Sequence, residues 1–332
     1  LASRLASSGG RVAIVERRYF GGTCVNTGCI PTKAMVASAY AAHLARRAAD
    51  YGVQAGPVTV DMKAVKARKD RISAESRESL EGWLKSMPNA TVFEGHARLE
   101  SANEVRVGEV LLRAPRIFLN VGGRALIPDL PGLETVPYLT NSSMIQVDFL
   151  PEHLLILGGS YIGLEFGQMF RRFGSRVTIL EPGPRLLSRE DADISSAILD
   201  ILRQEGIDIH LGTKATSVEA RSSGLALHAI SKERTLEIQG SHLLVATGRR
   251  PNTDSLGLDR AGVVTDSHGY VSVDEQLRTN VDGIWALGDC NGKGAFTHTS
   301  FNDYEIVAAN LLDNDPRKVS DRIPAYALYI DP

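Results

Sequence analysis

Short apolar runs that end beside a glycine or an acidic residue recur along the chain. Residues 12–15 follow a Gly-Gly turn and end at Glu16, residues 154–157 lead into Gly158, and residues 177–180 end at Glu181. Uninterrupted apolar runs of about four to eight residues are typical of strands buried on both faces, as in parallel sheets. The pattern therefore predicts an α/β protein.

Between these runs, other stretches of the chain have the apolar spacing of helices or the pattern of short strands. Apolar and charged positions alternate with helical spacing over residues 34–51 and 61–87, and the charged stretch 63–81 is interpreted as a solvated helix face. Strand signals and a last helix complete the prediction. The strands are at residues 90–94, 104–107, 110–112, 117–121, 243–247 and 284–287, and the helix is at 302–312.

One pattern occurs twice in the chain. Residues 173–181 repeat the turn and strand of residues 9–16, and the second copy follows a strand, a glycine turn and a helix start at residues 154–163. Internal similarity of this kind indicates a duplicated structural unit. We therefore expect an equivalent strand and glycine turn upstream of Leu1, and interpret the printed chain as part of a longer one.

The repeated unit has the features of a dinucleotide-binding motif. In such motifs a glycine turn leads into a helix whose N-terminus faces a pyrophosphate, and an acidic residue ends the second strand beside a ribose. Glu16 and Glu181 both occupy that acidic place. A lone acidic residue is usually part of a solvated turn, but the recurrence favours binding. The glycine spacing is met by Gly158 and Gly163, with Ser160 in place of the middle glycine.

Cys24 and Cys29 carry the strongest chemical signal. They stand in the stretch GGTCVNTGCIPTK, at the start of a helix. Side chains five residues apart do not face each other on a regular helix, but Gly28 allows unusual backbone angles there, so the pair can close. A helix N-terminus lowers a thiol pKa from about 8.5 to roughly 3.5–7.5.

A redox pair is favoured over two other interpretations of these cysteines. Two ordinary buried cysteines would not need the flanking glycines, the proline and the single Lys33. A structural zinc ion needs about four ligands, and the chain has only one further cysteine, Cys290. We expect Cys290 to be a small packed residue and not a third redox centre.

The stretch from Gly21 to Lys33 resembles the redox-active segment of the class I pyridine nucleotide–disulfide oxidoreductases. This family includes dihydrolipoamide dehydrogenase, glutathione reductase and mercuric reductase. The sequence of the stretch is most similar to that of the dihydrolipoamide dehydrogenases and mercuric reductases. The stretch 284–289 resembles the family's strand–Gly–Asp motif, and the turns at Gly122 and Gly248 resemble those that close its FAD and NAD domains.

The resemblance implies two Rossmann-like (β/β/α) dinucleotide-binding domains, one for FAD and one for NAD(P). The FAD-binding domain would comprise residues 1–147 and 271–332, and the NAD(P)-binding domain residues 148–270. The family's dimerisation domain, through which the intact protein would form a homodimer, is absent from the printed chain. If this chain is all that is made, we expect it to bind FAD poorly and to turn over no disulfide.

The resemblance also assigns roles to single residues. Hydride from the nicotinamide would reach the flavin, and the flavin would reduce the Cys24–Cys29 disulfide. Cys29 would face the flavin as a charge-transfer thiolate, and Cys24 would exchange with the substrate. Lys33 would pair with Glu165 beside the flavin. The residues implied for catalysis are Cys24, Cys29, Lys33, Glu165 and Tyr161.

The cofactor-binding residues follow from the same resemblance. For FAD they are Glu16, Gly22, Thr23, Lys33, His96, Ala97, Gly122, Asp289 (on the ribityl chain) and Thr297. For NAD they are Gly158, Ser160, Tyr161, Ile162, Gly163, Glu181, Ala215 and Gly248.

Three of these assignments carry an open alternative or a further expectation. Tyr161 resembles the aromatic residue that covers the flavin, although a packed helix-start aromatic is a live alternative. Neither His96 nor His298 is given a chemical step. Glu181 favours NADH over NADPH because its charge would repel a 2′-phosphate, and the nearby Arg185 would soften that preference.

Composition narrows the partners and the location. The net charge of −2 favours neither nucleic acid nor an anionic membrane as a partner, and no apolar run approaches the length of about 20 residues that spans a bilayer. Three cysteines in 332 residues fit a reducing compartment, so we expect a cytoplasmic enzyme. No bound metal is expected.

The predicted function is reduction of a small-molecule disulfide or of a metal ion such as mercuric ion. The alternatives are a dihydrolipoamide dehydrogenase that reduces NAD, a transhydrogenase, and a non-catalytic nucleotide-binding module. Transhydrogenases of the family lack the second redox cysteine, whereas Cys29 is present here.

Overall fold

The computed structural model describes residues 1–332 except residue 233. The chain folds into two compact units. The first comprises residues 1–26, 74–124 and 249–326, and the second comprises residues 27–73, 125–248 and 327–332. The second unit thus extends beyond the predicted NAD(P) part, 148–270, and residues 249–270 belong to the first unit. Which nucleotide each unit holds stays a prediction.

A five-stranded parallel sheet forms the centre of the second unit. Its strands lie in the order β11-β10-β9-β15-β8, and every neighbouring pair is parallel. Its bounds are β8 (Tyr138–Leu139), β9 (His153–Leu157), β10 (Arg176–Glu181), β11 (Asp208–Leu211) and β15 (His242–Val245). The predicted α/β class is therefore confirmed.

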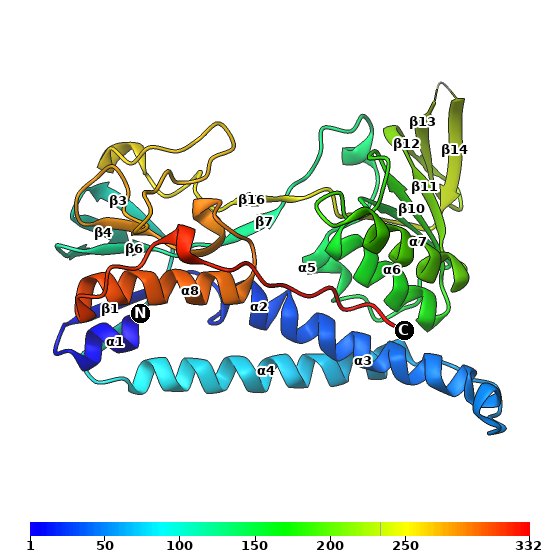
Figure 1. The fold of residues 1–332 in the computed structure, drawn as a ribbon, viewed down its shortest axis with the longest axis horizontal. Helices are drawn as coiled ribbons and strands as arrows, with labels where there is room; N and C mark the ends of the chain where they lie inside the picture. The colour runs from blue at the N-terminus through cyan, green and yellow to red at the C-terminus, as the bar shows by residue number, and fades with distance from the viewer. Residues whose placement is uncertain (233) are drawn as a thin grey trace. The chain divides into compact units, whose positions relative to one another are not determined.

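The side chains of β9 point alternately to the two faces of this sheet and show that each face is covered by another layer. Leu154 and Ile156 enter the core beneath the helices, whereas Leu155 and Leu157 enter a second core against another sheet. Successive side chains of a strand point to opposite faces, so a strand that is apolar at every position must be covered on both sides. The second core is closed by an antiparallel three-stranded sheet, β12 (Thr213–Arg221), β13 (Gly224–Ser231) and β14 (Arg234–Gly240) (Figure 1).

Helices of the second unit pack on the first of these cores. Met35 and Ala39 of α3 share it with Leu164, Phe166 and Phe170 of α6. The helices of this unit are α3 (Cys29–Arg46), α5 (Asn141–Met144), α6 (Tyr161–Phe173) and α7 (Ala192–Gln204), with a 3₁₀ turn at Ala48–Tyr51. Helix α4 (Met62–Ser86) begins in the second unit and continues into the first.

Two parallel strands organise the core of the first unit. These strands are β6 (Ile117–Leu119) and β17 (Ile284–Ala286), and the first and last residue of each enters one core. The middle residues, Phe118 and Trp285, stack with 5.2 Å between their ring centres and belong to a second core with helix α8 (Thr297–Ala308). The remaining elements are α1 (Ala2–Ser7), β1 (Val12–Glu16), α2 (Gly22–Asn26), β2 (Ala90–Glu94), β3 (Ala97–Ser101), β4 (Glu104–Val107), β5 (Val110–Arg113), β7 (Gly123–Ala125) and β16 (Arg249–Pro251). Short turns of the first unit lie at Asp259–Ala261, Gly288–Asn291, Ala309–Asp313 and Val319–Asp321, and one of the second unit lies at Leu133–Thr135.

Several predicted bounds need correction. The last helix begins at Thr297 and not at residue 302, and its regular part ends at Ala308 before a π turn. The strand predicted at 117–121 ends at Leu119. Helix α3 begins at Cys29, five residues before the predicted helical run, and ends at Arg46. Among the described residues, no helix combines the length and the apolar character needed to cross a bilayer.

Candidate functional site

The glycine turn between β9 and α6 brings its backbone close to the neighbouring strand. Gly158 has φ +111°, and a Cβ there would lie 2.4 Å from the carbonyl oxygen of Ala246. A Cβ on Gly163 would lie 2.1 Å from the carbonyl oxygen of Gly158. Because neither position can hold a side chain, the turn stays narrow, and a narrow glycine turn before a helix N-terminus is typical of anion-binding sites.

Ser160 fits this turn without strain. It is the N-cap of α6 at φ −113°, an extended conformation open to any residue, and its side chain is exposed and makes no capping hydrogen bond. A middle glycine is thus unnecessary for the backbone angle. The serine hydroxyl lies at the helix N-terminus, where a phosphate group would bind.

The carboxylate of Glu181 is held between the glycine turn and the loop after β10. It accepts one hydrogen bond from the backbone N–H of Gly159 and one from that of Gly183, both at 2.7 Å. Arg185, which we expected to soften the charge of Glu181, donates instead to the carbonyl oxygen of Ser188 at 2.8 Å. Both oxygens of the Glu181 carboxylate are therefore held by backbone N–H groups at the end of β10.

Tyr161 is the first residue of α6. Its hydroxyl donates to Glu190 at 2.5 Å, a partner that the sequence pattern did not single out. Of the other predicted NAD residues, Ile162 follows Tyr161 in α6, Ala215 lies at an irregularity of β12, and Gly248 has φ +136° just after β15.

Cys29 and Lys33 lie one helical turn apart at the beginning of α3. Cys29 is exposed and Gly28 is the N-cap. The Lys33 ammonium donates to both carboxylate oxygens of Glu165 in α6, at 2.7 and 2.6 Å. Only 10% of the Glu165 side chain is exposed, against 31% for Lys33. The structure thus joins the helix that begins at Cys29 to the helix that follows the glycine turn.

Tyr329 is a further neighbour of this ion pair. Its backbone N–H donates to Glu165 at 3.0 Å, and the Lys33 ammonium lies 4.2 Å from the centre of its ring. Sequence reasoning missed Tyr329 because a backbone donor leaves no sequence signal. A cation over the face of an aromatic ring is attracted by the ring electrons, so the Tyr329 ring stabilises the Lys33 ammonium group.

In the first unit, Cys24 lies in the short helix α2 and is half-buried. The preceding turn is tight, because Gly21 has φ +91° and a Cβ there would lie 2.4 Å from the side chain of Val25. Gly22 and Thr23 begin α2. Glu16 ends β1, and its carboxylate accepts the backbone N–H of Arg18 at 2.9 Å.

Asp289 follows Gly288 in the turn after β17. Its carboxylate lies 3.3 Å from the guanidinium of Arg249, which also donates to the carbonyl oxygen of Gly123 at 2.6 Å. Gly288 has φ +68°, and a Cβ there would meet the side chains of Asn120 and Ser300 at 2.8 Å. The turn can therefore hold only glycine at this position.

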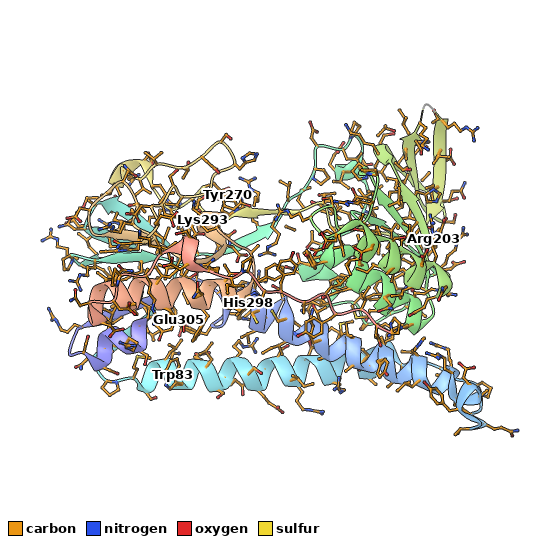
Figure 2. All side chains as sticks on the ribbon, viewed as in Figure 1. Trp83, Arg203, Tyr270, Lys293, His298 and Glu305 are labelled. Carbon is orange, nitrogen blue, oxygen red and sulfur yellow. The ribbon has the colours of Figure 1, made fainter. Side chains whose placement is uncertain are left out.

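The remaining predicted FAD residues of the first unit are spread over three elements. His96 precedes β3, which Ala97 begins, and its ring nitrogen lies 2.9 Å from the carbonyl oxygen of Ser255. Gly122 has φ +65° before β7, and Thr297 is the first residue of α8. His298 follows in α8 (Figure 2). Its ring stacks on that of Phe296, with 5.4 Å between the ring centres.

Cys290 is buried in the core of the first unit, as the sequence led us to expect. Its thiol donates to the carbonyl oxygen of Leu287 at 3.2 Å, and burial raises the pKa of Cys290 to about 11. Because the folded-state pKa lies above the ordinary value of 9.0, the native state holds this proton more tightly than the unfolded state. The resulting stability is present below about pH 9 and is lost as the pH rises towards about 11.

We expect Cys290 to resist alkylation in the native protein. At pH 8 the buried thiol is protonated, and the thiolate is the reactive form. Peptide mass spectrometry after iodoacetamide treatment should find position 290 unmodified until guanidinium is added. Modification of Cys290 in the folded protein, at a rate like that of an exposed cysteine, would contradict this assignment.

These features define a class of protein that binds two dinucleotides. The second unit has a glycine turn without room for side chains, a helix N-terminus and a fixed carboxylate, which fit a pyrophosphate and a ribose. In the first unit, Glu16 ends a strand and Asp289 follows a glycine-only turn, so each presents a carboxylate of the kind that accepts hydrogen bonds from hydroxyl groups.

Comparison with known proteins gives the family. Residues 1–303 match the family described as pyridine nucleotide-disulphide oxidoreductase, and the chain belongs to it. The resemblance seen in the sequence is thereby confirmed. FAD and NAD(P)H are the cofactors of this family, and FAD-dependent oxidoreduction is its general activity.

The chain is similar to several curated relatives over nearly all of its length. It is 36% identical to the probable pyridine nucleotide-disulfide oxidoreductase RclA of Escherichia coli, covering all of this chain and 72% of the relative. It is 39% identical to the mercuric reductase of Streptomyces lividans, over 94% of this chain and 67% of the relative. It is 33% identical to the dihydrolipoyl dehydrogenase of Chlamydia muridarum, over 92% of this chain and 66% of the relative.

Solved structures agree with the sequence relatives. The HOCl-induced flavoprotein disulfide reductase RclA of Escherichia coli superposes with a TM-score of 0.88 at 36% identity, covering 99% of this chain and 72% of the other. A Cu(II) complex of the same protein superposes equally well.

Proposed function

We propose that the protein is a flavoprotein reductase that passes electrons from NAD(P)H through the Cys24–Cys29 pair to a small disulfide or a metal ion. The observation that carries this proposal is the ion pair between Lys33 and Glu165. It fixes α3, which begins at the second redox cysteine, to α6, which begins at the glycine turn for the nicotinamide dinucleotide.

The chain's own residues have distinct tasks in this proposal. Bound FAD supplies the carrier that takes hydride from the nicotinamide and delivers two electrons to the disulfide. Glu165 holds the Lys33 ammonium, which keeps a positive charge one helical turn from Cys29. Cys24 is the thiol that exchanges with substrate. In the net reaction a disulfide and NADH plus one proton yield a dithiol and NAD⁺.

The names of the relatives favour two classes of substrate. The mercuric reductases suggest mercuric ion, a soft metal ion, as a substrate, and the Cu(II) complex of RclA suggests cupric ion as another. The dihydrolipoyl dehydrogenase points to a small dithiol or disulfide, including turnover in the NAD-reducing direction. A dithiol reduces either class. We also propose that the intact protein is a homodimer in the cytoplasm.

The test is NADH oxidation by the FAD-loaded holoenzyme with three substrates: mercuric ion, cupric ion and lipoamide disulfide. We expect turnover that depends on at least one of them and exceeds the rate with dioxygen alone. Oxidation of NADH that none of the three accelerates would overturn the proposed reductase function.

We expect NADH to be preferred over NADPH. The carboxylate of Glu181 is fixed by two backbone N–H groups and cannot turn away from a 2′-phosphate, so the two negative charges would repel each other. Stopped-flow reduction of the holoenzyme should give a ratio of flavin-reduction rate constant to Kd for NADH at least about tenfold above that for NADPH, a difference of about 1.4 kcal/mol. Glu181→Ser should shrink this ratio, whereas faster reduction by NADPH in the unchanged enzyme would contradict the assignment.

A further inference from the structure

A fully buried carboxylate lies behind the turn that carries Asp289. Asp303, in α8, is 0% exposed. Its Oδ2 accepts the backbone N–H of Gly288 at 2.8 Å and the side-chain amide of Asn291 at 2.9 Å, so it contacts both ends of the turn Gly288–Asn291. Buried backbone N–H groups need an acceptor, and Asp303 supplies it for Gly288.

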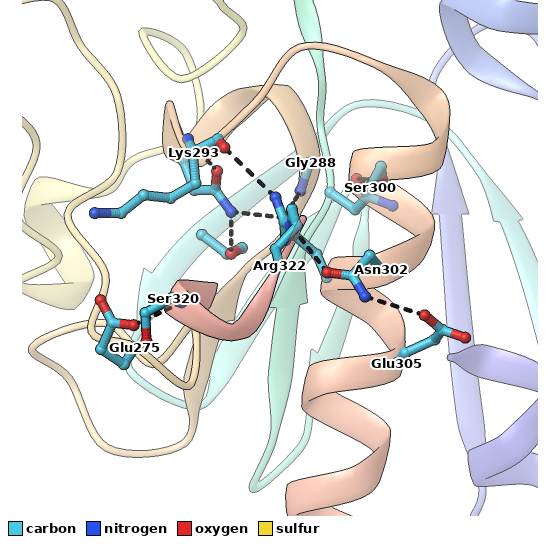
Figure 3. A network of polar contacts seen from close by, with 12 residues as sticks. Glu275, Gly288, Lys293, Ser300, Asn302, Glu305, Ser320 and Arg322 are labelled. Carbon is cyan, nitrogen blue, oxygen red and sulfur yellow. Dashed lines mark hydrogen bonds and ion pairs between the residues drawn. The ribbon is translucent and has the colours of Figure 1, made fainter. Parts of the chain in front are cut away.

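Arg322 balances the charge of Asp303. Its guanidinium pairs with Oδ1 of Asp303, donates to the side chain of Asn302 at 2.7 Å, and reaches the carbonyl oxygen of Lys293 at 3.4 Å (Figure 3). Only 11% of the Arg322 side chain is exposed. A buried carboxylate is costly unless it is paired, so Arg322 is what allows Asp303 to act as a charged acceptor.

The segment that carries Arg322 is itself fixed to the first unit. Glu275 accepts the backbone N–H of Ser320 at 2.9 Å through its side chain, and that of Val319 at 2.9 Å through its carbonyl oxygen (Figure 3). Arg322 is therefore held from a second side and does not rely on Asp303 alone for its position.

This network reaches the cofactor residue through one peptide unit. Gly288 is confined by its left-handed backbone and by Asn120 and Ser300, so the direction of its N–H sets the direction of the next residue, Asp289. We propose that Asp303, paired with Arg322, is a positioning residue that holds the Gly288–Asp289 turn in the form that binds FAD. This inference rests on the proposed role of Asp289 toward the ribityl chain.

Two double variants separate the acceptor from the ion pair. In Asp303→Asn with Arg322→Met, no charge is buried, and the asparagine carbonyl can still accept the Gly288 N–H. In Asp303→Leu with Arg322→Met, the charges are equally absent but no acceptor remains. Removing the partner of a buried donor costs enough to change a binding constant about tenfold.

The measurement is FAD titration of the flavin-stripped protein, followed by quenching of flavin fluorescence well below the melting temperature of each variant. We expect the leucine double variant to bind FAD about tenfold more weakly than the asparagine double variant. Asp289→Asn should weaken binding at least as much. Arg172→Met, which breaks a buried ion pair in the second unit, should leave FAD affinity within about twofold while lowering stability.

The outcomes distinguish this inference from the function on which it rests. Equal FAD affinity of the two double variants, with weak binding by Asp289→Asn, would overturn the positioning role and leave the proposed reductase intact. Unchanged affinity of Asp289→Asn would remove the assigned role of Asp289, and the inference with it. Equal weakening by Arg172→Met would show a general loss of stability and would also overturn the inference.

Discussion

Replacing Cys24 or Cys29 by serine is expected to lower the reductase turnover of the holoenzyme by at least about a thousandfold. A hydroxyl group cannot form the disulfide that stores the two electrons. The motif stretch places Cys29 at the exposed start of α3 and Cys24 in the helix just before it. Steady-state NADH oxidation with the preferred substrate measures this loss.

Two controls make the result specific to the thiol pair. Cys290→Ala removes the third cysteine, which is buried and protonated, and should keep turnover within about threefold. Stopped-flow reduction of the bound flavin by NADH should persist in both serine variants, because the dinucleotide residues are intact. Full substrate turnover by Cys24→Ser and Cys29→Ser would show that electrons leave the protein by another route.

Breaking the pair between Lys33 and Glu165 is expected to destabilise the protein by about 2 kcal/mol. Lys33→Met leaves the Glu165 carboxylate 10% exposed and without its cation, although the N–H of Tyr329 still donates to it. The expected cost is below that of a fully buried pair because Lys33 is 31% exposed. Urea unfolding, monitored by circular dichroism, gives the change in free energy.

The double variant Lys33→Met with Glu165→Leu should recover most of this loss, because neither charge is then buried alone. A matched control is Lys85→Met. Lys85 also bridges to carboxylates, those of Glu81 and Glu94, but on the surface, so the urea midpoint should stay essentially unchanged. Equal effects of Lys33→Met and Lys85→Met would contradict the distinction between a buried and a surface pair.

Local patterns predicted much of the fold because strand and helix signals are local. The strands at 90–94 and 104–107 have the predicted bounds, and the apolar runs before Glu16 and Glu181 are strands β1 and β10. The residues of β10 before Glu181 are largely buried as predicted, whereas those of β1 are half-buried or exposed. Four consecutive apolar residues, 154–157, predict a strand that is covered on both faces, and the structure places β9 between two layers. The α/β class followed from those few runs.

The sequence did not reveal the layer that covers the second face of this sheet. Strand β14 alternates polar and apolar positions because one of its faces is exposed, and we made no strand prediction for β12, β13 or β14. Residue 233, between β13 and β14, lies outside the described structure. Helix α7 was also missed, although its apolar residues follow helical spacing.

The candidate site shows the same division between local and distant information. Motif spacing indicated Cys24, Cys29 and the glycine turn, and the resemblance suggested that Lys33 pairs with Glu165. The structure places that pair at 2.6 Å. It adds partners that no motif spacing indicated, because they lie outside the motifs: Glu190 on Tyr161, Tyr329 on Lys33, and Asp303 behind Asp289.

One measurement tests the central claim most directly. One sample of the FAD-loaded holoenzyme is treated with iodoacetamide under anaerobic conditions, and a second sample is treated in the same way after one equivalent of NADH has been added. The mass of the peptide that contains both motif cysteines is then measured by mass spectrometry. The account predicts an unmodified, disulfide-linked peptide before NADH and modification of Cys24 and Cys29 afterwards, with Cys290 unmodified in both samples. Two alkylated motif cysteines in the fully oxidised, folded protein, or a disulfide that NADH leaves intact, would contradict it.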